Sequence, residues 1–169
     1  MARQNPTESA KPSKVTPKRV VIGGAAVVAC AVVGVYFFWP HASVLDASTV
    51  RQVKFPVYAP KSSPEGFVLQ KNSTVVTDST ITYSFANDQN DIITVTVQPR
   101  PSSLDMRQMI EGGSVKSTVL ASGTLYDLSA GGASKYLLDM GDSLVFITSA
   151  RSINTSTINA LAIDLQRVN

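Results

Sequence analysis

The chain has 169 residues and a formal net charge of +3, but this charge is unevenly distributed. Residues 1–19 carry five Lys or Arg and one Glu, whereas the rest of the chain carries 10 Lys or Arg and 11 Asp or Glu. The larger part is therefore nearly neutral, which excludes the basic surface typical of nucleic-acid binding. Its length suits one domain.

The residues that most often act as bases, nucleophiles and zinc ligands are almost absent. Cys30 and His41 are the only cysteine and the only histidine. The chain beyond them lacks the side chains for a disulfide, a Ser-His-Asp or Cys-His catalytic set, or a common zinc site. We therefore predict no catalytic, cofactor-binding or metal residues and a protein that is not an enzyme. A carboxylate-based hydrolase stays a distant alternative.

Residues 1–19 are rich in Pro, Ser, Thr and Lys and poor in apolar side chains. Such a composition cannot bury enough apolar surface to fold, so we expect a disordered basic tail. Positive residues stay on the cytoplasmic side of a membrane. The tail is therefore expected in the cytoplasm.

Residues 20–39, VVIGGAAVVACAVVGVYFFW, contain no charged side chain. A helix of this length spans the roughly 30 Å hydrocarbon core of a bilayer. The aromatic residues 36–39 suit the headgroup level at its outer end, and Pro40 ends the helix. We predict an integral, single-pass transmembrane helix with type II topology, in which the C-terminal domain lies outside the cytoplasm.

Two cleavage readings compete with a permanent anchor. Ala29-Cys30-Ala31 has the small residues of a signal-peptide cleavage site, and Val27-Val28-Ala29-Cys30 is similar to a lipobox. Whether Cys30 is lipidated stays open. However, both sites lie in mid-span, so cleavage would leave an apolar stub on the mature protein.

Small residues recur every four positions within the predicted span, at Ala26, Cys30 and Gly34. This spacing lets two membrane helices approach closely. We therefore treat these three residues as a candidate helix–helix contact, either in a homodimer or with an envelope protein.

Residues 40–53 are interpreted as a stalk, and residues 54–169 as one extracytoplasmic α+β domain. Pro56, Pro60 and Pro64 favour an extended entry onto this domain. Within the entry we expect an edge strand that offers a candidate contact to a partner, formed by Phe55, Val57 and Tyr58.

Alternating apolar residues predict most of the strands of the domain. The clearest signal is a hairpin of residues 80–85 and 91–98, joined by the turn residues 87–90. Further strands are expected at 67–71, 73–77, 114–121, 124–128, 133–140 and 143–149, with the apolar last one central in the sheet. This pattern predicts an antiparallel sheet.

Two amphipathic segments predict helices. The first is residues 102–111, with Ser102 and Asp105 at capping-box spacing, and the second is residues 155–166, with Asn154 as its N-cap. We expect both helices to pack on one face of the sheet, after the N-terminal transmembrane helix.

Two groups of acidic residues are candidate sites. Residues 87–91, NDQND, offer oxygen atoms to a calcium ion but lack the EF-hand pattern. Asp139 and Asp142 flank a turn and could form an acid–base pair. We interpret both groups as ordinary turn residues.

The segments FPVYAPKSSPEGFVL and SLVFITSARSINTSTINALAIDL give the chain a resemblance to bacterial single-pass membrane-anchored proteins that carry an extracytoplasmic domain of unknown function. The resemblance implies an α+β domain outside the cell membrane and brings no catalytic residues. The sequence thus favours a membrane-anchored binding or sensing module of the cell envelope. The alternative is a structural or assembly subunit of an envelope complex.

Overall fold

The computed structural model describes residues 43–110 and 115–169. In these residues no helix is long and apolar enough to cross a membrane. The predicted tail, the predicted span with Ala26, Cys30 and Gly34, and His41 lie outside the described residues.

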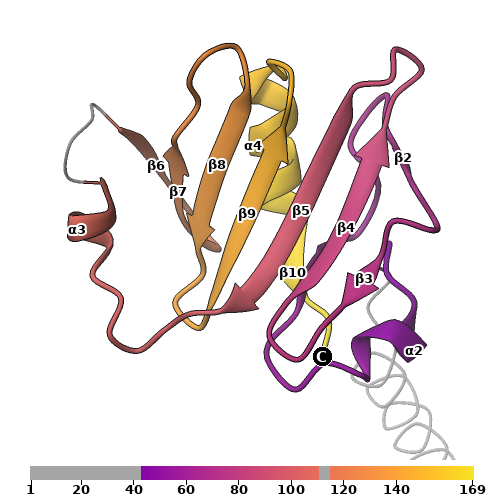
Figure 1. The fold of residues 1–169 in the computed structure, drawn as a ribbon, viewed down its shortest axis with the longest axis horizontal. Coiled ribbons are helices and arrows are strands. Elements are labelled where there is room, and N and C mark those ends of the chain that lie inside the picture. The colour runs from indigo at the N-terminus through magenta and orange to yellow at the C-terminus, as the bar shows by residue number, and fades with distance from the viewer. Residues whose placement is uncertain (1–42, 111–114) are drawn as a thin grey trace, which may run out of the picture. The chain divides into compact units, whose positions relative to one another are not determined.

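The described part contains two antiparallel sheets and three short helices (Figure 1). The helices are α2 (Ala47–Val50), α3 (Met106–Ile110) and α4 (Thr155–Asp164). The strands are β1 (Tyr58–Pro60), β2 (Val68–Leu69), β3 (Val75–Val76), β4 (Ile81–Ala86), β5 (Ile92–Pro99), β6 (Lys116–Leu120), β7 (Gly123–Asp127), β8 (Ser134–Asp139), β9 (Ser143–Ser149) and β10 (Leu165–Arg167). The predicted α+β class with an antiparallel sheet is confirmed.

The larger sheet has eight strands in the order β2-β4-β5-β9-β8-β7-β6, and β3 also pairs with β4. The predicted hairpin is confirmed, since β4 and β5 pair along their length from Ile81↔Val97 to Ala86↔Ile92. The predicted central place of β9 is also confirmed, because it lies between β5 and β8. The strands β1 and β10 form a separate two-stranded sheet.

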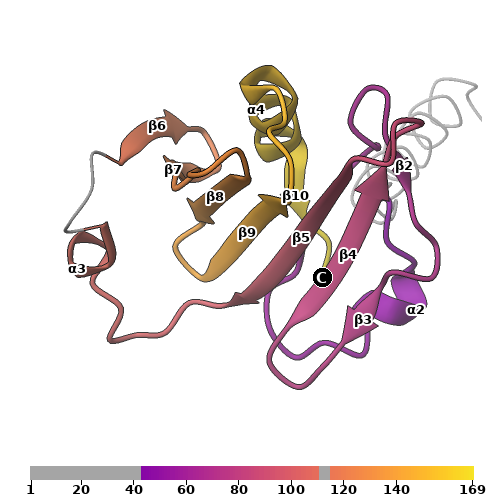
Figure 2. The ribbon, with the colours of Figure 1, turned by 45° about the horizontal axis from the view of Figure 1, so that its top comes forward.

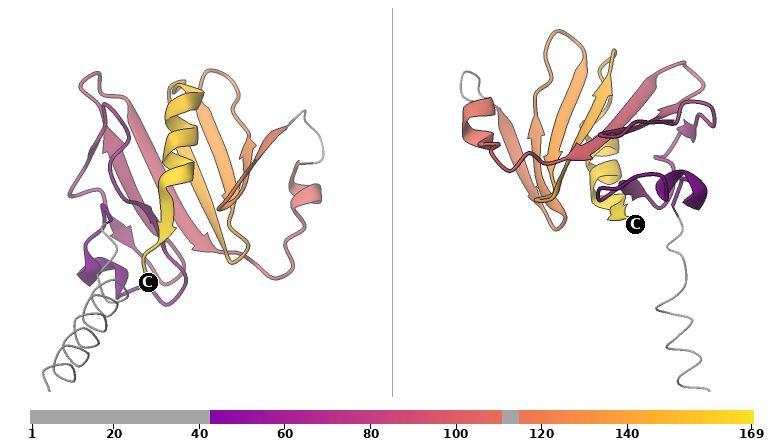
Figure 3. Two further views of the ribbon diagram at one scale, coloured as in Figure 1. Left: turned by 180° about the vertical axis from the view of Figure 1, so that it is seen from behind. Right: turned by 60° about the horizontal axis from the view of Figure 1, so that its bottom comes forward.

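One face of the larger sheet carries the main core. Strands β4 and β5 alternate buried and half-buried side chains, as the sequence pattern predicts. Helix α4 crosses this face (Figure 3), and the segment 43–60 also packs on it. The core is formed by Leu45, Val50, Val53, Phe55, Val57, Ala59, Ile81, Tyr83, Phe85, Ile93, Val95, Val97, Leu125, Tyr136, Leu138, Val145, Ile147, Ile153, Ile158, Leu161, Ala162 and Leu165.

The expectation that both helices cover one face is wrong. Met106 of α3 packs with Leu137 and Leu144 in a second, smaller cluster. Leu144 alternates along β9 with Val145 of the main core, so α3 and α4 lie on opposite faces. Asp105 accepts a hydrogen bond from the Arg107 backbone N–H, which explains why α3 begins later than the predicted residue 102.

The predicted stalk also differs from the structure. Leu45, Val50 and Val53 are 6%, 3% and 7% exposed and belong to the main core. Residues 43–53 are therefore part of the folded domain, whose boundary precedes the predicted residue 54. At the other end of the domain, the Asn154 side chain caps α4 by accepting a hydrogen bond from the Ser156 N–H, as predicted.

Candidate functional site

A groove of about 570 Å³ opens between the first described residues and one edge of the larger sheet. Its lining residues come from α2 and its flanking positions, and from the short strands β2 and β3 with the loop between them. Figures 1 and 2 show α2 beside β3. It is lined by Val44, Leu45, Asp46, Thr49, Gln52, Leu69, Lys71, Thr74 and Val76. This volume lies in the range of small-molecule sites, roughly 300–1,000 Å³. We call it the entry groove.

The sequence explains why this groove exists. Leu45 and Val50 bury their side chains in the core and so hold α2 against the domain. On the sheet side, β2 and β3 have only two residues each. Such short edge strands leave a recess beside β4, and the residues around them, including Lys71 and Thr74, line it.

Most polar side chains of the entry groove have no hydrogen-bond or ion-pair partner in the described part of the chain. Asp46 is the N-cap residue of α2, yet its carboxylate makes no capping hydrogen bond. Within the described part of the chain, Asp46 and Lys71 join none of the ion pairs. The hydroxyl groups of Thr49 and Thr74 likewise have no partner there. One exposed anion, one exposed cation and two half-buried hydroxyl groups thus line the groove together with apolar side chains and are free to bind a ligand.

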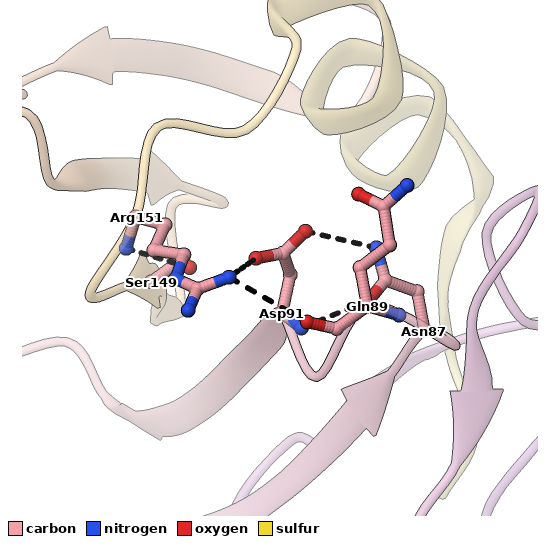
Figure 4. Close-up of polar contacts among 5 residues, drawn as sticks. All are labelled: Asn87, Gln89, Asp91, Ser149 and Arg151. Carbon is pink, nitrogen blue, oxygen red and sulfur yellow. Dashed lines mark hydrogen bonds and ion pairs between the residues drawn. The ribbon is translucent and has the colours of Figure 1, made fainter.

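In the turn at residues 87–91, by contrast, the polar side chains of Asn87 and Asp91 have partners (Figure 4). The Asn87 side-chain oxygen accepts hydrogen bonds from the N–H groups of Gln89 and Asp91, and Asn87 Nδ2 donates to Asp91 Oδ2 at 3.0 Å. Arg151 Nη1 lies 2.9 Å from Asp91 Oδ1. The Asn87 hydrogen bond, followed by that of Arg151, holds the pKa of Asp91 below its usual value. These oxygen atoms serve the turn, as the interpretation of a hairpin turn expects.

Asp139 and Asp142 form hydrogen bonds with different residues. Asp139 accepts hydrogen bonds at 3.1 Å from Arg100 Nε to both of its carboxylate oxygens. Asp142 instead accepts a hydrogen bond from the Tyr58 hydroxyl at 3.0 Å. Burial, and then this hydrogen bond, raises the pKa of Tyr58. The structure therefore uses both carboxylates in fixed contacts that tie neighbouring segments together.

The predicted partner contact is placed mainly inside the domain. Phe55 and Val57 are 8% and 0% exposed and belong to the main core. Tyr58 is half-buried and begins β1, which pairs with β10 as Tyr58↔Arg167. The entry segment does form a strand, but its side chains meet the C-terminal strand and the core.

A second cavity of about 490 Å³ lies between residues 61–65 and residues 160–164 of α4. Here a polar group already has a partner, because the Asp164 carboxylate accepts a hydrogen bond from the Ser62 N–H at 3.1 Å. In the described residues, no three His, Cys, Asp or Glu side chains are arranged as a metal site. The entry groove is therefore the better candidate for a ligand site.

Sequence reasoning missed the entry groove because residues 40–53 were interpreted as a stalk. The available signal was a short apolar stripe, formed by Leu45, Val50 and Val53, next to Asp46, a residue type that is common at the N-cap position. A helix of four residues gives too few turns for a clear periodicity. The sheet side of the groove depends on contacts between distant segments, which no local pattern reports.

Comparisons with known proteins found no matching family model, no similar curated protein and no similar solved structure.

Proposed function

We propose that the protein is a membrane-anchored binding or sensing module whose domain lies outside the cytoplasm, at a bacterial cell envelope. The apolar residues 20–39 and the basic tail before them support the anchor and its orientation.

The observation that carries the binding function is the entry groove. It combines four apolar side chains with Asp46, Lys71 and two hydroxyl groups that have no partner in the described chain. Asp46 and Lys71 are exposed, and Thr49 and Thr74 are half-buried, so all four polar groups can be reached by a ligand from solvent. A small polar ligand that carries both charges, or a flexible polar segment, would match this lining.

Site-specific photo-crosslinking tests the proposal in intact cells. A benzoylphenylalanine placed at Thr74 reports on the entry groove, and the same residue placed at exposed Ser152 is the control. We expect an adduct at position 74 that weakens in Asp46→Asn and Lys71→Gln but persists in Asp78→Asn and Lys54→Gln. Equal labelling at both positions, or labelling insensitive to the groove variants, would contradict a ligand site.

The second candidate function is a structural or assembly subunit of an envelope complex. The observation that favours it is the open edge of the larger sheet at β6, where Val119 is 84% exposed. In the same experiment, a stable protein adduct at position 74 in place of a small-molecule adduct would favour assembly. Loss of that partner in Gly34→Leu would point to the transmembrane helix as its contact.

A further inference from the structure

Strand β6 is an unusually open sheet edge. It ends the order of strands, pairs only with β7 in the described part of the chain, and lies at the end of the sheet in Figures 1 and 2. Its first four residues are exposed, and Val119 is the most exposed large apolar side chain of the described residues. An open edge of this kind can pair with a further strand.

The hydrogen-bond pattern shows which groups of β6 are free. Leu128 donates its N–H to the Lys135 carbonyl of β8. Since strand residues alternate in direction, Leu125 and Asp127 direct their main-chain groups to β6. Their partners there are Thr118 and Lys116. The main-chain groups of the intervening residues, Ser117 and Val119, therefore point outward from the sheet.

The opposite edge is protected, which makes β6 stand out. There β2 and β3 are two-residue strands with a break between them. The Ser73 hydroxyl fills this break, since it accepts a hydrogen bond from the Ser84 N–H at 2.9 Å. Short strands and irregular hydrogen bonding are common protections of a sheet edge. The continuous edge at β6 has none of these, and only Lys116 places a charge on it.

We propose that β6 is a homodimer interface, at which the β6 strands of two copies pair antiparallel across a two-fold axis at Thr118. This register overlaps all five residues of β6. In this register Ser117 of each copy lies opposite Val119 of the other copy. The outward-pointing main-chain N–H and C=O groups of these residues therefore face each other. Each such pair exchanges two hydrogen bonds, giving about four across the interface.

Charge does not oppose self-pairing in this register. Lys116, the one charged residue of β6, lies opposite the apolar Leu120 of the second copy. The two Lys116 Cα positions are then four residues apart along the strands, about 14 Å at 3.4 Å per residue. This exceeds the Debye length of about 8 Å at physiological salt, so the like charges repel little.

A five-residue edge forms a small interface, and pairing between free domains is expected to be weak. The inference therefore rests in part on the proposed membrane anchor, which confines both copies to one plane and raises their effective concentration. It does not depend on the entry groove. Carbonate extraction of the membranes tests the anchor separately, so failure of the anchor and failure of the pairing are distinguishable.

Cysteine crosslinking of the full chain in its membrane tests the pairing. In a Cys30→Ser background, Thr118→Cys places two thiols across the proposed axis, at a non-hydrogen-bonded pair with Cα atoms about 4.5 Å apart. That separation permits a disulfide. The matched control is Val75→Cys, an exposed valine on the opposite edge. We expect a disulfide-linked dimer at position 118 and at most trace dimer at position 75.

Adding Val119→Pro to Thr118→Cys should abolish the dimer. Proline removes an N–H that points outward, so the β6–β7 hydrogen bonds remain. Val119→Thr, which keeps the N–H, should retain the dimer. Position 118 crosslinking no better than position 75 would overturn the proposal, and so would a dimer that survives Val119→Pro. A disulfide between the Thr118→Cys variant and a different protein would also overturn the proposal. It would indicate that β6 pairs with a strand of that protein and not with a second copy.

Discussion

Arg151 and Asp91 are 60 positions apart in the sequence and form an ion pair, with Arg151 Nη1 2.9 Å from Asp91 Oδ1. The pair joins the segment after β9 to the turn between β4 and β5 (Figure 4). Asn87 completes the contact by donating to the other carboxylate oxygen of Asp91. This one carboxylate therefore fixes a tight turn and a distant segment together.

We predict that this contact gives stability that disappears in acid. The pKa of Asp91 is lowered from its usual 3.8, chiefly by the Asn87 hydrogen bond and then by Arg151. The stabilisation is therefore complete above the usual value and is lost as the pH falls through the lower folded value. Asp91→Asn should reduce the melting temperature near pH 7, and the difference from the wild type should narrow below about pH 4.

Thermal unfolding from about pH 7 to about pH 2.5 measures this difference. Asp88→Asn is the matched control, because Asp88 is exposed in the same turn and joins none of the ion pairs of the described structure. A gap between wild type and Asp91→Asn that stays constant over the whole range would show that the carboxylate charge is not the cause.

Strand β9 offers a test of which sheet face carries the main core. Ile147 is 0% exposed in that core, whereas its neighbour Phe146 is half-buried on the opposite face beside Leu137 and Leu144. Ile147→Ala should lower the free energy of unfolding by about 2–5 kcal/mol. Phe146→Ala should cost less, despite the larger side chain removed. Urea unfolding measures both, and a larger loss for Phe146→Ala would contradict this assignment of the faces.

The difference between these neighbours also shows how far the sequence could predict the structure. The apolar run in 143–149 predicts a strand with a central place in the sheet, because apolar content is a local property. Which face of the sheet each helix covers depends on long-range packing. Phe146 is the bulkiest apolar residue of that strand, so side-chain size alone would place it in the main core. However, α4 and the segment 43–60 cover the face of Val145 and Ile147 instead.

A buried serine provides a third prediction. The Ser134 side chain is hydrogen-bonded to the Ile153 N–H at 2.8 Å, in a fully buried contact that holds the start of the α4 segment to β8. Ser134→Ala would leave this N–H without a partner, at a cost of about 1–3 kcal/mol. The control is Ser129→Ala, which removes the same kind of bond to the Lys135 N–H at an exposed site where water can replace it. Chemical denaturation should show little change for the control, and equal losses in both would contradict the argument.

The last prediction concerns where the folded domain begins. A fragment of residues 43–169 should be more stable than one of residues 54–169, because the shorter fragment lacks three buried side chains, Leu45, Val50 and Val53. Fully burying such a side chain contributes about 1.5–3 kcal/mol. Residue 44 also donates its N–H to the Pro60 carbonyl at 3.1 Å, which ties the segment to β1.

Urea unfolding of the two fragments measures this contribution, and the triple variant Leu45→Ser, Val50→Ser, Val53→Ser in the longer fragment is the control. We expect the triple variant to behave like the shorter fragment, because the stabilisation comes from apolar burial and not from chain length. Equal midpoints for the two fragments would mean that residues 43–53 only rest on the domain. The entry groove would then lose the wall on which the proposed binding function depends.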